Sequence, residues 1–403
     1  MTTKSTKHVA EAGRKGEDVR ADCWVAVTPA ESGGIDLQLT TKVESMYGES
    51  TRKLIREILT KLEVANARVE VDDTGALPFV IAARIEAAVR RLGFDVGEGF
   101  LPEFAPGTEC ETRRDRLRRS RLYLPGNEPK FMLNAGFHNP DGIILDLEDS
   151  VAPPQKDAAR VLVRNALRTL DFREAERMVR INQGDAGIED VAFIAPHNVH
   201  VVLIPKVEAA EQVQRVDEAI RKLLQTRGID RPVYLMPIVE SALGAIKAYE
   251  IAKSSDRIVA LTIGLEDYTA DIGVARTLDG RESFWARSQV VNAARAAGVQ
   301  PIDTVFSDVA DMDGLRASVL EAKGLGFDGK GCIHPRQIAI INECFAPTEA
   351  ELAKARQIVD AFEEAEAKGL GVVSLGSKMI DPPVVKRAQR IVRLAEAMGK
   401  GGR

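Results

Sequence analysis

The chain has 403 residues, of which 45% are hydrophobic and 29% charged, and this length can bury the core of one large domain plus a small one. Its formal net charge of −5 argues against the basic patches that bind nucleic acid or membrane surfaces. Residues 1–20 lack the apolar centre of a signal peptide, so we expect a soluble cytoplasmic protein without nucleic-acid or membrane partners.

The first part of the chain predicts a small α+β domain at residues 21–95, preceded by a flexible tail over residues 1–20. Its strands are expected at residues 23–29, 35–43 and 67–73, and its helices at residues 48–64 and 79–93. Glycine and proline cluster after this module, which indicates a linker at residues 96–116.

From Ser120 onward, short β-rich runs alternate with longer amphipathic segments. The expected strands are "RLYLP", "GIILDL", "MVRIN", "VHVVLIP", "PVYLMPI", "RIVALTIG", "VQPIDTV" and "FDGKGCI". Strands separated by helices pair in parallel, and eight such units favour a closed barrel over an open sheet. The predicted fold is therefore α/β, with a (β/α)8 TIM barrel at residues 117–346 and a helical extension at residues 347–403.

Acidic side chains follow several of these strands. Glu148 and Asp149 follow the second strand, Glu240 the fifth, and Asp267 the sixth. In such barrels the active site lies at the carboxyl ends of the strands, so these groups are expected to meet. Crowded carboxylates raise one another's pKa and need a cation, and oxygen ligands indicate Mg²⁺ or Mn²⁺. Glu240 and Asp267 are the best-placed metal ligands.

Less specific interpretations exist for several of these polar residues. A carboxylate at a strand end can cap the next helix, and Asp149 and Asp303 are the most open to that interpretation. Arg180 lies in an apolar strand, so it needs a carboxylate from the protein or from a substrate. His197 and His200 flank a strand start and are interpreted as solvated loop residues.

Eight ordered segments within residues 116–398 resemble the citrate lyase beta chain. The resemblance extends to malyl-CoA, citramalyl-CoA and citryl-CoA lyases, in the HpcH/HpaI aldolase superfamily. The segments are "RRSRLYLPGN", "DLEDSV", "VRIN", "IPKVE", "PIVESALG", "GLEDYTADIG", "GCIHPRQI" and "KMIDPPVVKRA".

The resemblance implies roles for five residues of the barrel. Glu240 of the "ES" motif and Asp267 of "GLED" would hold magnesium. Arg180 of "VRIN" would bind the carboxylate of a 2-oxoacid. Glu148 and Asp149 would act through water molecules bound to the metal. Together these residues would serve the cleavage of a 3-hydroxyacyl-CoA thioester by a retro-Claisen reaction.

The resemblance also implies roles for residues outside the barrel centre. Asn127 and Lys130 would face the nucleotide end of the CoA thioester. Asp381 would be the catalytic acid/base, delivered as part of a lid by the C-terminal extension of a neighbouring subunit, which implies a homotrimer or a higher homo-oligomer. Asp381 precedes two prolines, so it also suits the N-cap of the following helix.

Residues 22–92 are similar to the citrate lyase gamma chain, which is an acyl carrier. The serine that holds the carrier's prosthetic group falls on Arg20 in this sequence. Arginine has no hydroxyl for a phosphodiester bond. We therefore expect that the carrier function is lost and that the lyase acts on a free CoA thioester.

Two other functions remain open from the sequence. The first is a class II aldolase that acts on free 2-oxoacids without CoA. The second is a non-catalytic scaffold whose N-terminal domain docks partners of a lyase complex. Arg180, Glu240, Asp267 and Asp381 argue against a scaffold, because a scaffold does not need a charged pocket.

Overall fold

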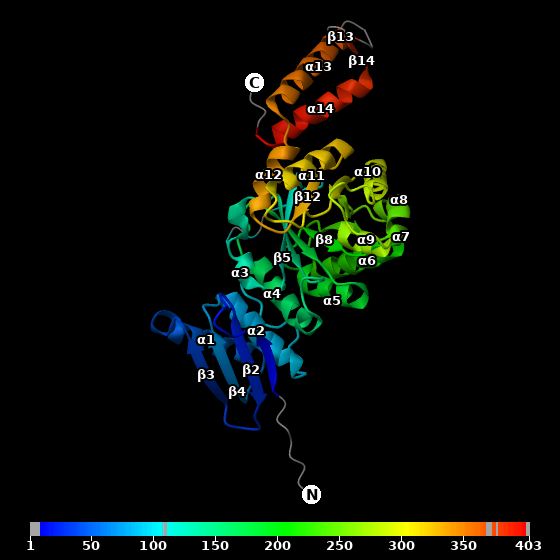
Figure 1. Cartoon of the computed structure of the whole chain (residues 1–403). Helices are drawn as coiled ribbons and strands as arrows, with labels where there is room; N and C mark the ends of the chain where they lie inside the picture. The colour runs from blue at the N-terminus through cyan, green and yellow to red at the C-terminus, as the bar shows by residue number, and fades with distance from the viewer. Residues whose placement is uncertain (1–8, 107, 109–110, 368–372, 376–377, 400–403) are drawn as a thin grey trace.

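The computed structural model describes residues 9–106, 108, 111–367, 373–375 and 378–399. Figure 1 shows a small N-terminal α+β module, a central barrel, and a C-terminal pair of helices that projects from the barrel. Within the described residues, no helix combines the length and the apolar character that crossing a membrane requires.

The N-terminal module is a four-stranded sheet with two helices. Its sheet order is β1-β2-β4-β3, in which only the β3 and β4 pair is parallel. Its elements are β1 (Ala10–Gly13), β2 (Cys23–Pro29), β3 (Ile35–Thr41), α1 (Glu44–Lys61), β4 (Ala67–Asp73) and α2 (Pro78–Arg91). The prediction of a flexible tail over residues 1–20 is wrong for β1, because this strand pairs with β2 along its whole length. Residues 1–8 lie outside the described part of the chain.

Helix α2 joins the module to the barrel. It is buried over Phe79–Val89 and packs between its own sheet and helix α4 (Lys156–Thr169) of the barrel. Most of its buried residues are apolar, as expected for a helix that is covered on both sides. Glu86 of α2 is fully buried and accepts two hydrogen bonds from Arg164 of α4, at 2.7 and 2.9 Å. This buried ion pair fixes the module against the barrel.

Eight parallel strands close the barrel, as predicted. Neighbouring strands pair in sequence order, and the last strand pairs with the first. The strands are β5 (Ser120–Pro125), β6 (Gly142–Asp146), β7 (Glu176–Arg180), β8 (Val201–Ile204), β9 (Tyr234–Val239), β10 (Ala260–Ile263), β11 (Gln300–Asp303) and β12 (Gly329–Cys332). One apolar cluster fills the barrel interior, and a larger one lies between the strands and the outer helices.

Helices surround the barrel and cover its strands (Figure 1). Besides α4 they are α3 (Pro129–Met132), η1 (Ala135–His138), η2 (Pro153–Gln155), α5 (Gly184–Ile194), α6 (Ala210–Arg227), α7 (Ala242–Ile246), α8 (Ala248–Ala252), α9 (Leu265–Asp271), α10 (Phe284–Ala297), α11 (Met312–Leu325) and α12 (Arg336–Phe345). This alternation of strand and helix directs every strand the same way, so the carboxyl ends of all eight strands meet at one face.

The C-terminal extension is a helical hairpin. It comprises α13 (Glu349–Ala367), β13 (Val373–Leu375), β14 (Lys378–Ile380) and α14 (Pro382–Ala397), and α13 packs along α14. Arg390 of α14 forms an ion pair with Asp328, which precedes β12. The hairpin is therefore attached at the face of the barrel where the strands begin, opposite the face that carries their carboxyl ends.

Candidate active site

A cavity of about 400 Å³ opens at the carboxyl ends of the barrel strands. Four of the predicted site residues line it, namely Asp149, Arg180, Glu240 and Asp267. They come from segments far apart in the sequence, at the ends of β6, β7, β9 and β10. Parallel pairing brings these strand ends to the same face, so the predicted position of the site is consistent with the structure.

Arg180 is held by a carboxylate that directly precedes the predicted ones. Asp146 and Arg180 are register partners on β6 and β7, and the guanidinium donates to the carboxylate at 2.6 and 2.7 Å. Burial alone would raise the pKa of Asp146, but the paired arginine holds that pKa below its usual range. The Nη1 atom of Arg180 remains directed toward Glu148, 3.1 Å away. The sequence predicted that Arg180 needs a carboxylate partner from the protein or from a substrate, and in the structure Asp146 is that partner.

Glu240 is a buried carboxylate at the end of β9. Its side chain accepts a hydrogen bond from the backbone N–H of Lys206 at 2.7 Å. Burial, and next the negative charge of Asp267, raise the pKa of Glu240 to about 8. Gly264 makes room for this carboxylate, because a Cβ at that position would lie 2.5 Å from Glu240 Oε2. A side chain at this glycine of "GLED" would therefore displace the Glu240 carboxylate from its present position.

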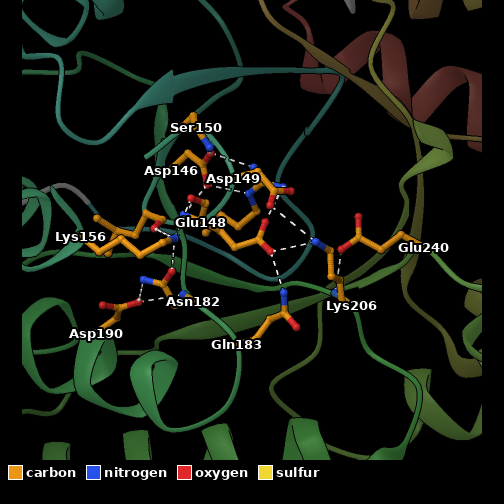
Figure 2. A network of polar contacts seen from close by, with 12 residues as sticks. Asp146, Glu148, Asp149, Ser150, Lys156, Asn182, Gln183, Asp190, Lys206 and Glu240 are labelled. Carbon is orange, nitrogen blue, oxygen red and sulfur yellow. Dashed lines mark hydrogen bonds and ion pairs between the residues drawn. The ribbon is translucent and has the colours of Figure 1, made fainter. Parts of the chain in front are cut away.

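Lys206 lies among the acidic residues of the site (Figure 2). Its Nζ is 3.3 Å from Glu148, 3.5 Å from Asp149 and 3.5 Å from Asp267. Partial burial opposes the ammonium charge, but Glu148 and the other carboxylates outweigh it and raise the pKa of Lys206. The amine is therefore held protonated, which disfavours a role as a Schiff-base nucleophile.

Glu148 is positioned by a network of polar contacts, which Figure 2 shows. Gln183 donates to its Oε1 at 3.0 Å, and Lys156 donates to its backbone carbonyl at 2.8 Å. Its Oε2 is buried and accepts no hydrogen bond of good geometry. Burial, and then the neighbouring Asp149, raise the pKa of Glu148. The Oε2 atom lies 3.1 Å from Nη1 of Arg180 in an ion pair, so both oxygens of Glu148 are held in place.

The donor set of the site suits a hard divalent cation. Among the described residues, no three or more His, Cys, Asp or Glu side chains converge into a complete metal site. Magnesium takes only one or two protein carboxylates and leaves its other positions to water and substrate. After burial, the negative charge of Asp267 is the next largest cause that raises the pKa of Glu240, so the two carboxylates repel each other when both are charged. A bound cation would relieve that repulsion, so the residues present fit magnesium.

Residues 119–335 match the family model of HpcH/HpaI aldolase/citrate lyase. The chain belongs to this family. Citrate lyase subunit beta of Leuconostoc mesenteroides subsp. cremoris is 42% identical over 288 residues, which cover 70% of this chain and 95% of that protein. Mitochondrial citramalyl-CoA lyase of Rattus norvegicus is 34% identical over 296 residues, covering 70% of this chain and 87% of that protein. The relatives are named as lyases, which confirms the expected enzyme class.

Among solved structures, the family member CitE from Mycobacterium tuberculosis superposes with a TM-score of 0.58 at 32% identity, covering 70% of this chain and 100% of that chain. It was crystallised in complex with magnesium, acetoacetate and coenzyme A. Residues 15–92 match a second family model, the malonate decarboxylase delta subunit, in the acyl carrier group. The carrier-like character expected for the N-terminal module is thereby confirmed.

Four of the eight predicted site residues are not among those that line the central cavity of this chain. Glu148 lies next to it, in contact with Arg180 and Lys206. The other three lie elsewhere. Asn127 lies at the contact with the N-terminal module, where its backbone carbonyl accepts a hydrogen bond from Arg84 at 3.0 Å. Lys130 lies on the surface, 3.6 Å from Glu128. Asp381 caps α14 by accepting from the backbone N–H of Val384 at 3.1 Å, so its capping interpretation is confirmed.

Two sequence interpretations of polar residues are wrong. His197 and His200 are 8% and 4% exposed, so they are not solvated. Burial, and then the nearby Arg168, lower the pKa of His197 to about 3. Asp303 does not cap a helix but is fully buried with Arg287 at 3.1 Å and Lys330 at 2.7 Å. The alternation of hydrophobic and polar residues along one segment cannot reveal such partners, because the partners come from other elements.

Proposed function

We propose that this chain is a magnesium-dependent carbon–carbon lyase. It cleaves a 3-hydroxyacyl-CoA thioester of the citryl-CoA, citramalyl-CoA or malyl-CoA type into an acyl-CoA and a 2-oxoacid. The observation that carries the proposal is the buried Glu240 beside Asp267, opposite Arg180, in one cavity at the carboxyl ends of the strands. The named activities of the 42% and 34% identical relatives support it.

Glu240 and Asp267 would hold the magnesium ion, or manganese in its place. When bound, the ion supplies positive charge for the oxygen that becomes negative during cleavage. Arg180 would bind the carboxylate of the oxoacid half through Nη1, because its other donors are occupied by Asp146. Asp146 thus orients the arginine before the substrate arrives, so this electrostatic stabilisation costs no reorganisation.

The retro-Claisen reaction also requires proton transfer at two places. A base takes the proton of the 3-hydroxyl group, the carbon–carbon bond breaks, and the enolate of the acyl-CoA accepts a proton. We assign proton transfer to Asp381, with Glu148 and Asp149 holding ordered water near the reacting oxygen. Burial, and then Asp149, raise the pKa of Glu148, so this carboxyl group binds a proton more readily than a solvated glutamate does.

The thioester itself would extend toward the outer surface near β5. Lys130 is exposed there and offers a positive charge for a phosphate of CoA, with Asn127 nearby in the chain. Arg20 is exposed and has no hydroxyl to carry a prosthetic group. We therefore propose free CoA thioesters as substrates, and a cytoplasmic location.

A panel of thioesters tests this function directly. Purified protein with magnesium is offered citryl-CoA, citramalyl-CoA and malyl-CoA, and a coupled dehydrogenase measures the 2-oxoacid released. We expect cleavage of at least one thioester, and no cleavage by the Asp267→Ala variant, which lacks a metal ligand. If all three thioesters stay intact while free 2-oxoacids undergo aldol cleavage or addition, the chain is a class II aldolase instead.

We further propose that the active site is shared between subunits of a homotrimer or higher oligomer. The hairpin that carries Asp381 is attached at the face of the barrel where the strands begin, so Asp381 does not line the cavity of its own chain. A neighbouring copy in a closed ring can supply it to the opposite face.

Complementation between two inactive variants tests the shared site. Asp381→Ala and Asp267→Ala chains, each inactive alone, are co-expressed in equal amounts and purified as mixed oligomers. About a quarter of the sites should then combine an intact barrel with an intact Asp381 from the neighbour, and the same fraction of activity should return. Mixed oligomers that stay as inactive as their parents would show that each chain completes its own site.

A further inference from the structure

One side chain at the floor of the cavity is a cation that the proposed chemistry does not use. Arg121 lies on β5, is 0% exposed and lines the cavity. Its register partners on the two adjacent strands are Gly142 and Gly331. Its guanidinium lies inside the barrel against Met236 and Thr262, where neighbouring positions such as Ile144 are apolar.

Arg121 has no carboxylate partner within the described residues. Its Nη1 donates to Met236 Sδ at 3.1 Å and to Thr262 Oγ1 at 3.3 Å, and its Nη2 reaches the backbone carbonyl of Asp303 at 3.5 Å. Its Nε is buried without any hydrogen-bond partner. Burial lowers the pKa of Arg121, yet an arginine stays charged in proteins. The guanidinium is therefore a buried positive charge that is not paired with a carboxylate of the described residues.

Two other fully buried arginines of this chain, Arg118 and Arg164, are paired with carboxylates. Arg118 donates to Glu176 at 2.7 and 2.8 Å, and Arg164 pairs with Glu86. A buried unpaired charge is costly, and it is retained where a ligand supplies the missing counter-charge. The unpaired charge of Arg121 therefore indicates that the ligand of this cavity carries an anionic group, which binds to Arg121.

We propose that Arg121 binds a second carboxylate on the oxoacid half of the substrate, so the enzyme prefers thioesters whose cleavage releases a dicarboxylic 2-oxoacid. This inference rests on the proposed lyase function and narrows its substrate class. Arg180 binds the first carboxylate of the oxoacid half, and Arg121, at the floor of the cavity, binds the second. Thr262 accepts from Arg121, so its own hydroxyl proton is free to donate to the same carboxylate. Citryl-CoA, which releases oxaloacetate, has this second carboxylate, whereas citramalyl-CoA, which releases pyruvate, does not.

The test compares these two thioesters in wild type, Arg121→Met and a control. Methionine keeps the length and removes the charge; Arg316→Met removes a surface arginine that pairs with Glu343 far from the cavity. We expect wild type and the control to prefer citryl-CoA in kcat/KM. In Arg121→Met the ratio of the two kcat/KM values should shift by about 100-fold toward citramalyl-CoA. The lost charge-assisted contact should lower kcat/KM only for citryl-CoA, because only this thioester has the second carboxylate.

A second readout does not depend on turnover. In thermal unfolding with magnesium, oxaloacetate should raise the melting temperature of wild type more than pyruvate does, and Arg121→Met should lose this difference. Without ligand, Arg121→Met should unfold at the same or a higher temperature than wild type, since it removes an unpaired buried charge. Thr262→Val should shift the thioester preference in the same direction by a smaller factor.

The outcomes separate this inference from the function on which it rests. If no thioester is cleaved by wild type, the lyase proposal fails, while the oxaloacetate melting experiment still decides the role of Arg121. If both thioesters are cleaved and Arg121→Met leaves their ratio unchanged, the lyase stands and the inference is overturned. A markedly lower melting temperature of ligand-free Arg121→Met would also overturn it, because the arginine would then be structural.

Discussion

Replacing Glu240 with glutamine is expected to lower kcat/KM by about 1,000-fold, because it removes one of two charged ligands for the metal. Glutamine keeps the size of the side chain and its hydrogen bond with the backbone of Lys206. The loss should therefore appear in catalysis and in magnesium affinity, and not in folding. Steady-state kinetics at several magnesium concentrations and a calorimetric magnesium titration measure the two effects.

The matched control for this variant is Glu343→Gln. Glu343 lies on the surface and pairs with Arg316, so its removal should leave magnesium affinity and kcat/KM unchanged. Full activity of Glu240→Gln at ordinary magnesium concentrations would contradict the assignment of Glu240 as a ligand. The metal would then have to be held by Asp267 with other groups.

Replacing Asp146 with asparagine is expected to affect both stability and activity. The change leaves Arg180 buried without its bidentate partner, which should reduce the free energy of unfolding by about 3–5 kcal/mol. It should also lower kcat/KM by about 100-fold, because Arg180 is then free to turn away from the substrate. Chemical denaturation and steady-state kinetics measure these losses, and Asp256→Asn, which breaks only a surface pair with Arg221, is the control.

The stability part of this prediction depends on pH. The folded protein holds the pKa of Asp146 below its usual range, so its ion pair contributes stability above the unfolded pKa of about 3.9. That contribution disappears as the pH falls through the lower folded value. The difference in unfolding free energy between wild type and Asp146→Asn should therefore be largest at neutral pH and should shrink below about pH 4. A difference that stays constant down to acid pH would show that the pair is not the cause.

The order of the elements and the face that carries the site could be predicted from the sequence. Eight β-rich runs separated by helical segments admit few topologies other than a parallel barrel, and parallel strands must gather their carboxyl ends at one face. For that reason Glu240 and Asp267, which lie far apart in the chain, were expected at one site, and the cavity brings them together. Strand β1 was missed, because four residues beside glycines carry too little pattern.

The sequence by itself determined the barrel, the acidic face and the family, because hydrophobic alternation and strand-end carboxylates are properties of single segments. Only the tertiary structure decided which groups neutralise one another. Asp146 partners Arg180 through strand register, while Arg121, in the same barrel, has no carboxylate partner in the part of the chain that the structure describes. The tertiary structure also decided that Asp381 does not line the cavity of its own chain. Charge pairing depends on side chains from distant strands, and no local pattern encodes which of them will meet.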